Sequence, residues 1–331
     1  MNNYTLIHLH SSFSNGVTNI DSITDCRDEI DAAKKMGMTA MAFSDHGNVF
    51  SWEHKKEWVE AAGMKYIHGI EAYVTETLDE KVRDNYHVIL LAKNYDGVKE
   101  INKLSSKSFN RNDNHFYYVP RITFDDLIHT SDNVIITSAC LGGILNCASE
   151  DLQSHFIEFM MAHKDRCFLE IQHHCDSEGR QAEYNKKLYD ISKRTGIRLV
   201  VGTDTHALND EHMEGRAILQ KSKKVHFENE DDWDLVLRSY DELISAFERQ
   251  NAVPMDEVVK ALENTNVIAD MVEEFEIDRS YKYPHLWDNP EELLRQKIKE
   301  GIKTRGFFLY SVEYFVLSKP IYETSRFFVS V

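Results

Sequence analysis

Short runs of apolar and β-branched residues recur along the first part of the chain, and polar or amphipathic segments separate most of them. Residues 4–9 read Tyr-Thr-Leu-Ile-His-Leu, a composition and alternation typical of a β-strand. Residues 28–36 and 181–193 follow a helical pattern instead, and Gly37 is suited to end the first of these helices. The pattern predicts seven strands, near residues 4–9, 39–43, 65–70, 87–92, 134–137, 167–171 and 198–202.

This alternation of strands and helices predicts a parallel α/β sheet or barrel. In a barrel, functional residues gather at the carboxyl ends of the strands. One link departs from the pattern, because the stretch between Glu71 and His87 is too short for a crossover helix. We therefore expect a hairpin or an irregular excursion there, and a barrel that is not regular.

The later part of the chain is mainly helical in pattern, and residues 257–275 form its clearest amphipathic helix. The prolines at 284 and 290 indicate a linker, and residues 291–303 predict a second, charged helix. Residues 307–331 are rich in aromatic side chains and follow neither pattern. We expect a domain at 1–280, with a core at about 1–210 and a helical extension at 211–280, and a further region at 281–331.

The formal net charge of −17 excludes a broad basic surface, so any contact with nucleic acid must be local. Bound cations would offset clustered carboxylates, although an acidic surface alone also explains the charge. The 5 cysteines lack paired spacing, which favours a reducing compartment over a disulfide framework. Neither a signal peptide nor a long apolar span is recognisable, so we expect a cytoplasmic protein without membrane contact.

Potential metal ligands occur at the ends of several predicted strands. His8 and His10 are two positions apart on a strand and therefore project from the same face. Each such residue also has an ordinary structural role available, as a helix cap, a buried thiol or a surface group. Imidazole, carboxylate and thiolate together suit zinc, and iron and manganese also accept such sites. The other strand-end candidates are His46, Glu71, His87, Cys140, Asp204 and His206.

Seven segments in a fixed order, from HLHSSFS through SDHGN, GIEAY, YHVILLAKNYDGVKEINKLSS, VPRITFDDL and SACLGGIL to VVGTDTH, resemble the PHP (polymerase and histidinol phosphatase) domain. The resemblance is to the form found at the N-terminus of bacterial and phage DNA polymerase III alpha subunits. It implies a distorted (β/α)7 barrel of PHP type, followed by a helical C-terminal extension.

The resemblance also implies up to three divalent metal ions (Zn, Mn or Fe). The first would be bound by His8, His10, Glu71 and Asp204. Glu71 would bridge to the second, which His87 and Cys140 also bind. His46, His206 and Asp21 would bind the third, with Asn15 and Asp25 as weaker alternatives to Asp21. The histidines not expected to be ligands are His54, His68, His115, His129 and His163.

By the same resemblance, the chain is a metal-dependent phosphoesterase, and specifically a 3′–5′ exonuclease that proofreads for a replicative polymerase. The attacking group would be a metal-bound water, with no side-chain nucleophile. Arg121, in the family's Pro-Arg motif, is a candidate phosphate contact, although a surface ion pair explains it equally well. His173 and His174 either shape the pocket or are incidental to it.

Two other functions fit the residues: a stand-alone histidinol-phosphatase-like enzyme, which the polymerase-like flanks disfavour, and a non-catalytic, metal-stabilised module. The expected partners are a DNA 3′ end and either the remaining polymerase region or other replication subunits. Polymerase activity is not expected, because the family's palm follows this region and the resemblance stops after residues 290–306. A truncation, a frame change, a split gene or a genuine docking tail would explain residues 307–331.

Overall fold

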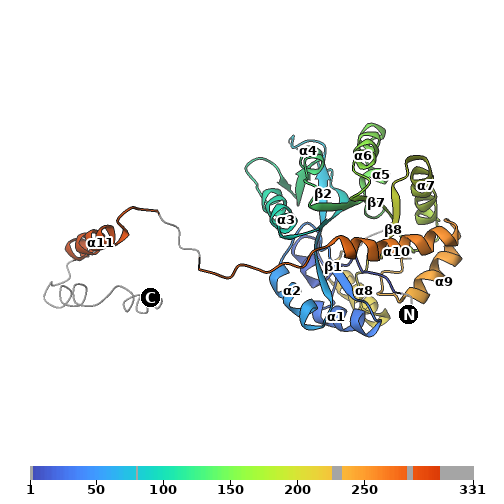
Figure 1. The fold of residues 1–331 in the computed structure, drawn as a ribbon, viewed down its shortest axis with the longest axis horizontal. Helices are drawn as coiled ribbons and strands as arrows, with labels where there is room; N and C mark the ends of the chain where they lie inside the picture. Colours follow the sequence, from blue (N-terminus) through green and yellow to red (C-terminus); the bar gives the residue numbers. More distant parts are fainter. Residues whose placement is uncertain (1–2, 80, 226–232, 282–285, 306–331) are drawn as a thin grey trace. The chain divides into compact units, whose positions relative to one another are not determined.

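The computed structural model describes residues 3–79, 81–225, 233–281 and 286–305, in which one curled sheet is surrounded by helices (Figure 1). The strands are β1 (Ala40–Phe43), β2 (Lys65–Thr75), β3 (Tyr86–Ala92), β4 (Phe116–Tyr117), β5 (Val119–Thr123), β6 (Val134–Thr137), β7 (Cys167–Ile171) and β8 (Arg198–Val201). A short 3-10 helix, η1 (Ser12–Gly16), follows the N-terminal segment. The α-helices are α1 (Cys26–Lys35), α2 (Trp52–Ala61), α3 (Tyr95–Ser108), α4 (Phe124–Ile128), α5 (Ile144–Cys147), α6 (Glu150–Ala162), α7 (Arg180–Thr195), α8 (Asp210–Lys223), α9 (Tyr240–Gln250), α10 (Met255–Met271) and α11 (Pro290–Arg305).

The sheet has the strand order β4-β5-β2-β3-β6-β7-β8, and β1 also pairs with β2. β1, β6 and β7 are buried at every position, as expected for parallel strands that helices cover. β2 is long enough to pair in parallel with β1 through its first half and with β5 through its last residues.

The N-terminal segment closes the curled sheet into a barrel. Leu6 forms a parallel bridge with Met41 of β1, and Leu9 forms one with Thr205, just after β8. The ring therefore consists of this segment followed by β1, β2, β3, β6, β7 and β8. The predicted strand at residues 4–9 is reduced to these bridges, because a bend at His8 interrupts its ladder.

The irregular link expected between Glu71 and His87 is a reversal of chain direction. β3 runs antiparallel to both β2 and β6, whereas β6, β7 and β8 are parallel. A parallel crossover needs a dozen or more residues, and fewer separate the end of β2 from the start of β3. The predicted distorted seven-stranded α/β barrel with a helical C-terminal extension is confirmed.

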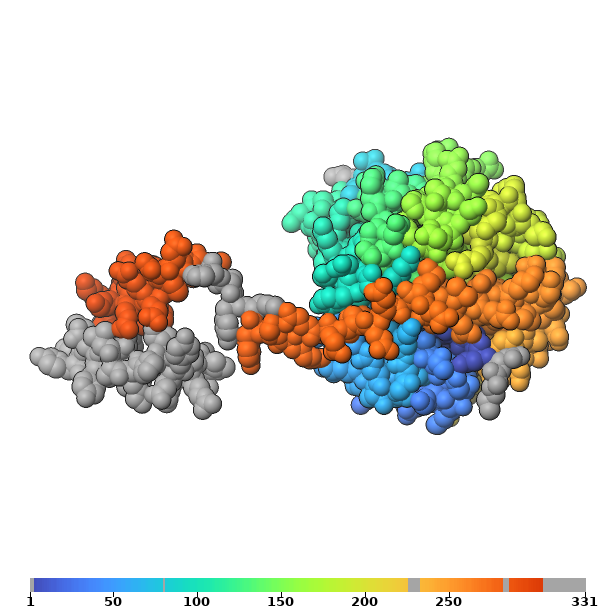
Figure 2. Space-filling model, in the orientation of Figure 1, coloured from blue at the N-terminus to red at the C-terminus, as the bar shows by residue number. Residues whose placement is uncertain are grey.

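Helix α10 closes the barrel at the amino-terminal ends of its strands. Thr265 accepts a hydrogen bond from the backbone of Thr5, and Lys65 donates to carbonyls at the end of α10. Ile268 belongs to the apolar cluster that also contains Ile67 and Phe168. Figure 2 shows α10 as an orange band between the blue N-terminal elements and the green and yellow ones. The opposite end of the barrel is left for polar side chains.

The chain divides into two compact units, Met1–Glu276 and Ile277–Val331. The second unit contains α11, in which no residue is buried. The aromatic segment at 307–331 lies outside the described residues. Within the part of the chain that the structure describes, no helix combines the length and apolarity needed to cross a membrane.

Candidate metal centre

The nine predicted ligands meet at the open end of the barrel. His46 follows β1, Cys140 follows β6, and His206 follows β8, so each leaves the carboxyl end of its strand. His87 stands near the start of β3 instead, but β3 is antiparallel and its start lies beside Tyr73, near the end of β2. The chain reversal therefore brings His87 to the same level as the others. All nine side chains are buried except that of His87, which is half-buried.

The residues predicted to bind the first metal are in mutual contact. His8 Nε2 lies 3.1 Å from His10 Nε2 and 3.1 Å from Asp204 Oδ1. His10 Nε2 lies 3.2 Å from the same Asp204 oxygen. Glu71 completes the group, with Oε1 at 3.4 Å from His8 Nε2 and Oε2 at 3.7 Å from His10 Nε2.

Glu71 also reaches the second predicted group. Its Oε1 is 3.0 Å from His87 Nδ1 and 3.7 Å from the sulfur of Cys140. His87 Nδ1 and Cys140 Sγ are 3.3 Å apart. One carboxylate thus touches both groups, which is the arrangement required of a bridging ligand.

The third predicted group is assembled around Asp21. Its two oxygens lie 3.3 Å from His46 Nε2 and 3.1 Å from His206 Nδ1. The ring of His10 stacks on His46 and His206, at centroid distances of 4.1 and 4.4 Å, so the first and third groups share a boundary. His10, His46 and His206 also form a set of converging ligand atoms.

The two alternatives to Asp21 have other roles. Asn15 accepts hydrogen bonds from the backbone of Asp21 and Ser22, so it holds the loop that carries Asp21. Asp25 is half exposed, caps α1 and pairs with Arg27.

Hydrogen bonds behind the centre fix the orientation of the first two histidines. His8 Nδ1 lies 2.6 Å from Glu170 Oε1, and Thr137 donates to the other oxygen of Glu170 at 2.5 Å. Such a carboxylate behind a ligating imidazole sets its tautomer and ring orientation. Gly202 makes room for it, because a Cβ there would lie 1.8 Å from Glu170 Oε1. Glu170 was not among the predicted residues, although a glutamate within the apolar run Cys-Phe-Leu-Glu-Ile was a usable signal.

A second network supports His10. Its Nδ1 lies 3.2 Å from the hydroxyl of Ser14, which donates to Asp45 at 2.8 Å. Asp45 also accepts from the backbone and hydroxyl of Ser11 and forms a buried ion pair with Lys55. Burial would raise the pKa of Asp45, but Lys55 outweighs it and lowers that pKa.

Left-handed backbone occurs at one of the predicted ligands and directly before two others. Asp204 itself has φ +47°, and Ile20 and Ala139, which precede Asp21 and Cys140, both have φ +56°. Left-handed backbone is unfavourable for residues other than glycine, and such strain is typical of functional sites. The local fold thus holds these ligands against an intrinsic preference.

The electrostatics fit divalent cations. Burial would raise the pKa of Glu71, but His87 and His46 outweigh it and hold that pKa well below its usual range. Burial would lower the pKa of His206, but Asp21 and Asp204 raise it to about 9. His46 Nδ1 and Glu71 Oε2 lie 2.6 Å apart, yet neither makes an aligned hydrogen bond. Binding of divalent cations by these carboxylates and imidazoles would release protons.

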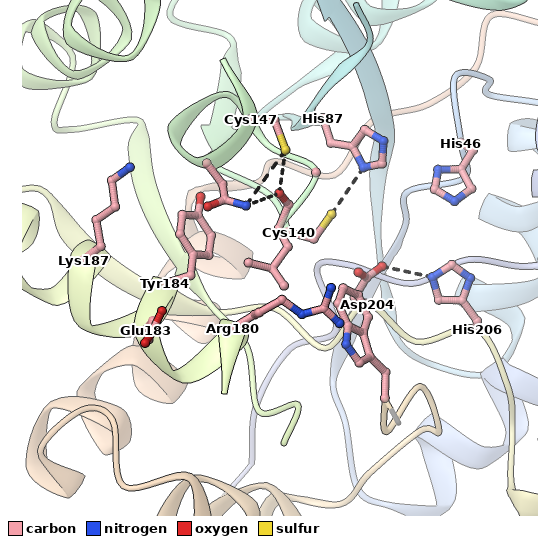
Figure 3. Close-up of a pocket in the computed structure, with 14 residues that line it drawn as sticks. His46, His87, Cys140, Cys147, Arg180, Glu183, Tyr184, Lys187, Asp204 and His206 are labelled. Carbon is pink, nitrogen blue, oxygen red and sulfur yellow. Dashed lines mark hydrogen bonds and ion pairs between the residues drawn. The ribbon is translucent and has the colours of Figure 1, made fainter. Parts of the chain in front are cut away.

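A cavity of about 640 Å³ opens beside these ligands (Figure 3). One side carries the predicted ligands His46, His87, Cys140, Asp204 and His206. Helix α7 contributes Arg180, Glu183, Tyr184 and Lys187 to the other side.

The expectation that Arg121 contacts phosphate is not supported by its surroundings. Arg121 is fully buried and is not among the residues that line the cavity. Its three guanidinium nitrogens donate to the backbone carbonyls of Val82, Asp84, Asn114 and His115. Arg121 therefore holds two loops together, and within the described part of the chain its guanidinium is engaged by backbone carbonyls.

The other histidines that the sequence analysis singled out are separate from the centre. His173 and His174 are buried behind Asp234, with His173 Nε2 at 3.7 Å from its carboxylate and His174 Nδ1 at 3.0 Å from its carbonyl. Neither belongs to a group of converging ligand atoms among the described residues. The same holds for the histidines not expected to be ligands, His54, His68, His115, His129 and His163.

Curated proteins similar to this chain include DNA polymerase III alpha subunits. The protein of that name from Borreliella burgdorferi is 32% identical over 323 residues, covering 90% of this chain and 27% of its own length. That from Aquifex aeolicus is 29% identical over 330 residues, again covering 90% and 27%. The chain thus spans about a quarter of the length of these relatives.

A solved structure of a presumed metal-dependent phosphoesterase from Bifidobacterium adolescentis is 14% identical, with a TM-score of 0.44. It covers 75% of this chain and 97% of its own. The profile of the PHP domain matches residues 7–174. Because that match covers half of the chain, this protein belongs to the PHP domain family.

Proposed function

We propose that this chain is a metal-dependent phosphoesterase that removes nucleotides from DNA 3′ ends. The observation that carries the proposal is the convergence of eight ligand side chains beside an open cavity, with Asp21 in contact with two of them. His8, His10, Glu71 and Asp204 would bind one ion, and Glu71, His87 and Cys140 a second. Asp21, His46 and His206 would bind a third.

Divalent ions bound there would supply an activated water and neutralise charge on a phosphate. The chain supplies the positioning: Glu170 and Ser14 orient His8 and His10, and Glu71 joins two groups through one carboxylate. Cys140 is buried, and burial together with Asp204 and Glu71 raises its pKa well above the usual value. A neutral thiol suits a latent ligand and not a nucleophile, so the attack is assigned to water.

DNA is the proposed substrate because the curated relatives are named as DNA polymerase III alpha subunits. The cavity volume lies within the range of roughly 300–1,000 Å³ typical of small-ligand sites. Such a space accommodates one terminal nucleotide and is too small for a duplex. The strongly acidic chain likewise disfavours a wide contact with duplex DNA. The rest of a polymerase would deliver the 3′ end.

The test combines metal analysis with hydrolysis. The protein, purified without added metal and then loaded with Zn²⁺ or Mn²⁺, is assayed on primers with a mismatched 3′ end and on small phosphomonoesters. We expect release of nucleotides from the primer and bound metal by elemental analysis. His8→Ala with His10→Ala should abolish both, whereas the control pair His54→Ala with His129→Ala should leave both unchanged.

Each other outcome has a distinct meaning. Hydrolysis of phosphomonoesters alone would favour the stand-alone phosphatase. Metal-loaded protein that hydrolyses neither substrate would refute both enzymatic functions and favour a metal-stabilised structural module. Retention of metal and activity in the folded His8/His10 double variant would refute the ligand assignment.

A further inference from the structure

The cavity has a second wall that the proposed metal groups do not use. Trp233 and four residues of α7 contribute to it. Figure 3 shows the α7 residues Arg180, Glu183, Tyr184 and Lys187 across the cavity from His46 and His87. Of these, Trp233 offers a broad aromatic surface and Arg180 a permanent positive charge. Together they are the kind of groups that bind a base and a phosphate in single-stranded nucleic acid.

Trp233 is held in a fixed orientation. Its indole stacks almost parallel on the ring of His174, with centroids 5.2 Å apart and an interplanar angle of 7°. His174 is fully buried, and burial, with the neighbouring His173, lowers its pKa to about 3, so the ring is neutral. Asp234, the next residue, receives hydrogen bonds from Arg238 at 2.9–3.0 Å. These contacts orient the indole beside the cavity.

Trp233 is not an ordinary core tryptophan. One face is covered by His174, yet the residue is only half-buried and lines the cavity. Its Nε1 is buried without a hydrogen-bond partner among the described residues. A buried indole N–H normally finds an acceptor, so an unsatisfied donor beside a cavity points to a ligand that completes it.

Arg180 is the cation best placed for a phosphate. Lys187, the other basic residue of the lining, donates to Leu145 O at 2.5 Å and to Gln153 at 2.8 Å, and so links α7 to α5 and α6. Arg180 faces Asp176 and Glu178 at 3.6 and 3.3 Å, and 37% of its side chain is exposed. Figure 3 shows it extending from α7 toward the side of the cavity that carries Asp204.

We propose that Trp233 and Arg180 form a subsite for the terminal nucleotide, with the base stacked on Trp233 and the phosphate beside Arg180. This inference rests on the proposed function and specifies its substrate as an unpaired 3′ end. A base can stack on Trp233 only after leaving its partner strand, and unpairing costs least at a mismatch. Stacking tolerates every base, because each has an aromatic face.

The experiment compares two single-stranded oligonucleotides that differ only at the 3′ residue: an ordinary nucleotide or an abasic tetrahydrofuran. Trp233→Leu should lower kcat/KM for the first by about 5- to 150-fold, the equivalent of about 1–3 kcal/mol, and leave the second unchanged. Trp233→Phe should retain most of the activity. The matched control is Trp58→Leu, since Trp58 stacks on His54 at 5.9 Å outside the cavity.

Binding provides a second readout. Calorimetry on Mn²⁺-loaded protein should show tighter binding of dAMP than of 2-deoxyribose 5-phosphate, and Trp233→Leu should remove the difference. Arg180→Gln should lower the affinity for both ligands by a similar factor, and Arg180→Lys should lower it less.

The outcomes separate this inference from the proposed function. If the wild-type protein hydrolyses neither oligonucleotide, the proposed function fails, and the calorimetry still decides the subsite. The base assignment is wrong if Trp233→Leu lowers kcat/KM equally for both oligonucleotides. It is also wrong if the wild-type protein binds dAMP and 2-deoxyribose 5-phosphate with equal affinity. Unchanged binding of the sugar phosphate in Arg180→Gln would overturn the phosphate assignment.

Discussion

Replacing Glu170 by glutamine tests whether the group behind His8 controls the metal centre. Glu170 Oε1 lies 2.6 Å from His8 Nδ1, and both side chains are fully buried. The substitution preserves the volume and the acceptor oxygen but removes the negative charge. Net contributions are about 1.5–3 kcal/mol for a hydrogen bond to a charged group and about 0.5–1.5 kcal/mol for a neutral one. The loss should therefore be about 1–1.5 kcal/mol.

At about 1.36 kcal/mol per tenfold change, that loss lowers the metal affinity by about 5- to 13-fold. Mutation of a group that supports a metal ligand typically lowers the affinity by about 10- to 100-fold, so the expected effect is at the lower end of that range. The assay is a competition titration with a chromophoric chelator, using Zn²⁺ or Mn²⁺. Glu29→Gln is the matched control, since Glu29 is also fully buried but lies on α1. Burial raises the pKa of Glu29 well above its usual value, so glutamine replaces a carboxyl that already favours its protonated form. Unchanged affinity in Glu170→Gln would refute the orienting role, and so would an equal loss in Glu29→Gln.

Three further predictions follow from the same geometry. Asp21→Ala should lower bound metal by about one ion per chain in elemental analysis, whereas Asp25→Ala should not; the reverse result would exchange their roles. The raised pKa of His206, about 9, means that a proton must leave before this ring binds metal. Affinity measured by chelator competition should therefore rise with pH, by about tenfold per unit for one proton, until about pH 9; a flat profile would contradict this. Gly202→Ala should weaken metal binding at least as much as Glu170→Gln, because its Cβ would displace that carboxylate; wild-type affinity would show that the strand can shift.

Much of the barrel could be predicted from the chain, because buried strands leave a strong apolar signal. The runs that form β6 and β7 are recognisable without any structure, and the predicted bounds agree with the observed ones. The direction of β3 was harder to predict from the sequence. The short link before Tyr86 indicated an irregularity, but only the paired register shows that the strand is reversed.

The ligand side chains could be predicted from the sequence for a similar reason: they follow strands, and strand ends meet in a barrel. The groups that support these ligands could not be predicted in this way. Glu170 lies in the middle of an apolar run, and its role depends on a histidine 162 positions earlier. Arg121 was misjudged because backbone carbonyls are its partners, and carbonyls have no sequence signature. Trp233 escaped notice because its significance comes from the cavity that it lines.

The packing of α10 against the strand starts has a consequence for the folding of the chain during synthesis. The backbone of Thr5 donates to Thr265, which is 260 positions later, and Lys65 donates to backbone carbonyls 204 and 207 positions later. At roughly 5–20 residues per second, a ribosome needs about 13–50 s between Thr5 and Thr265. During that interval α10 does not yet cover the apolar side chains at the amino-terminal ends of the strands. Contacts between residues so distant in sequence also slow folding. The partly synthesised barrel therefore exposes apolar surface at this end until residue 272 has been added.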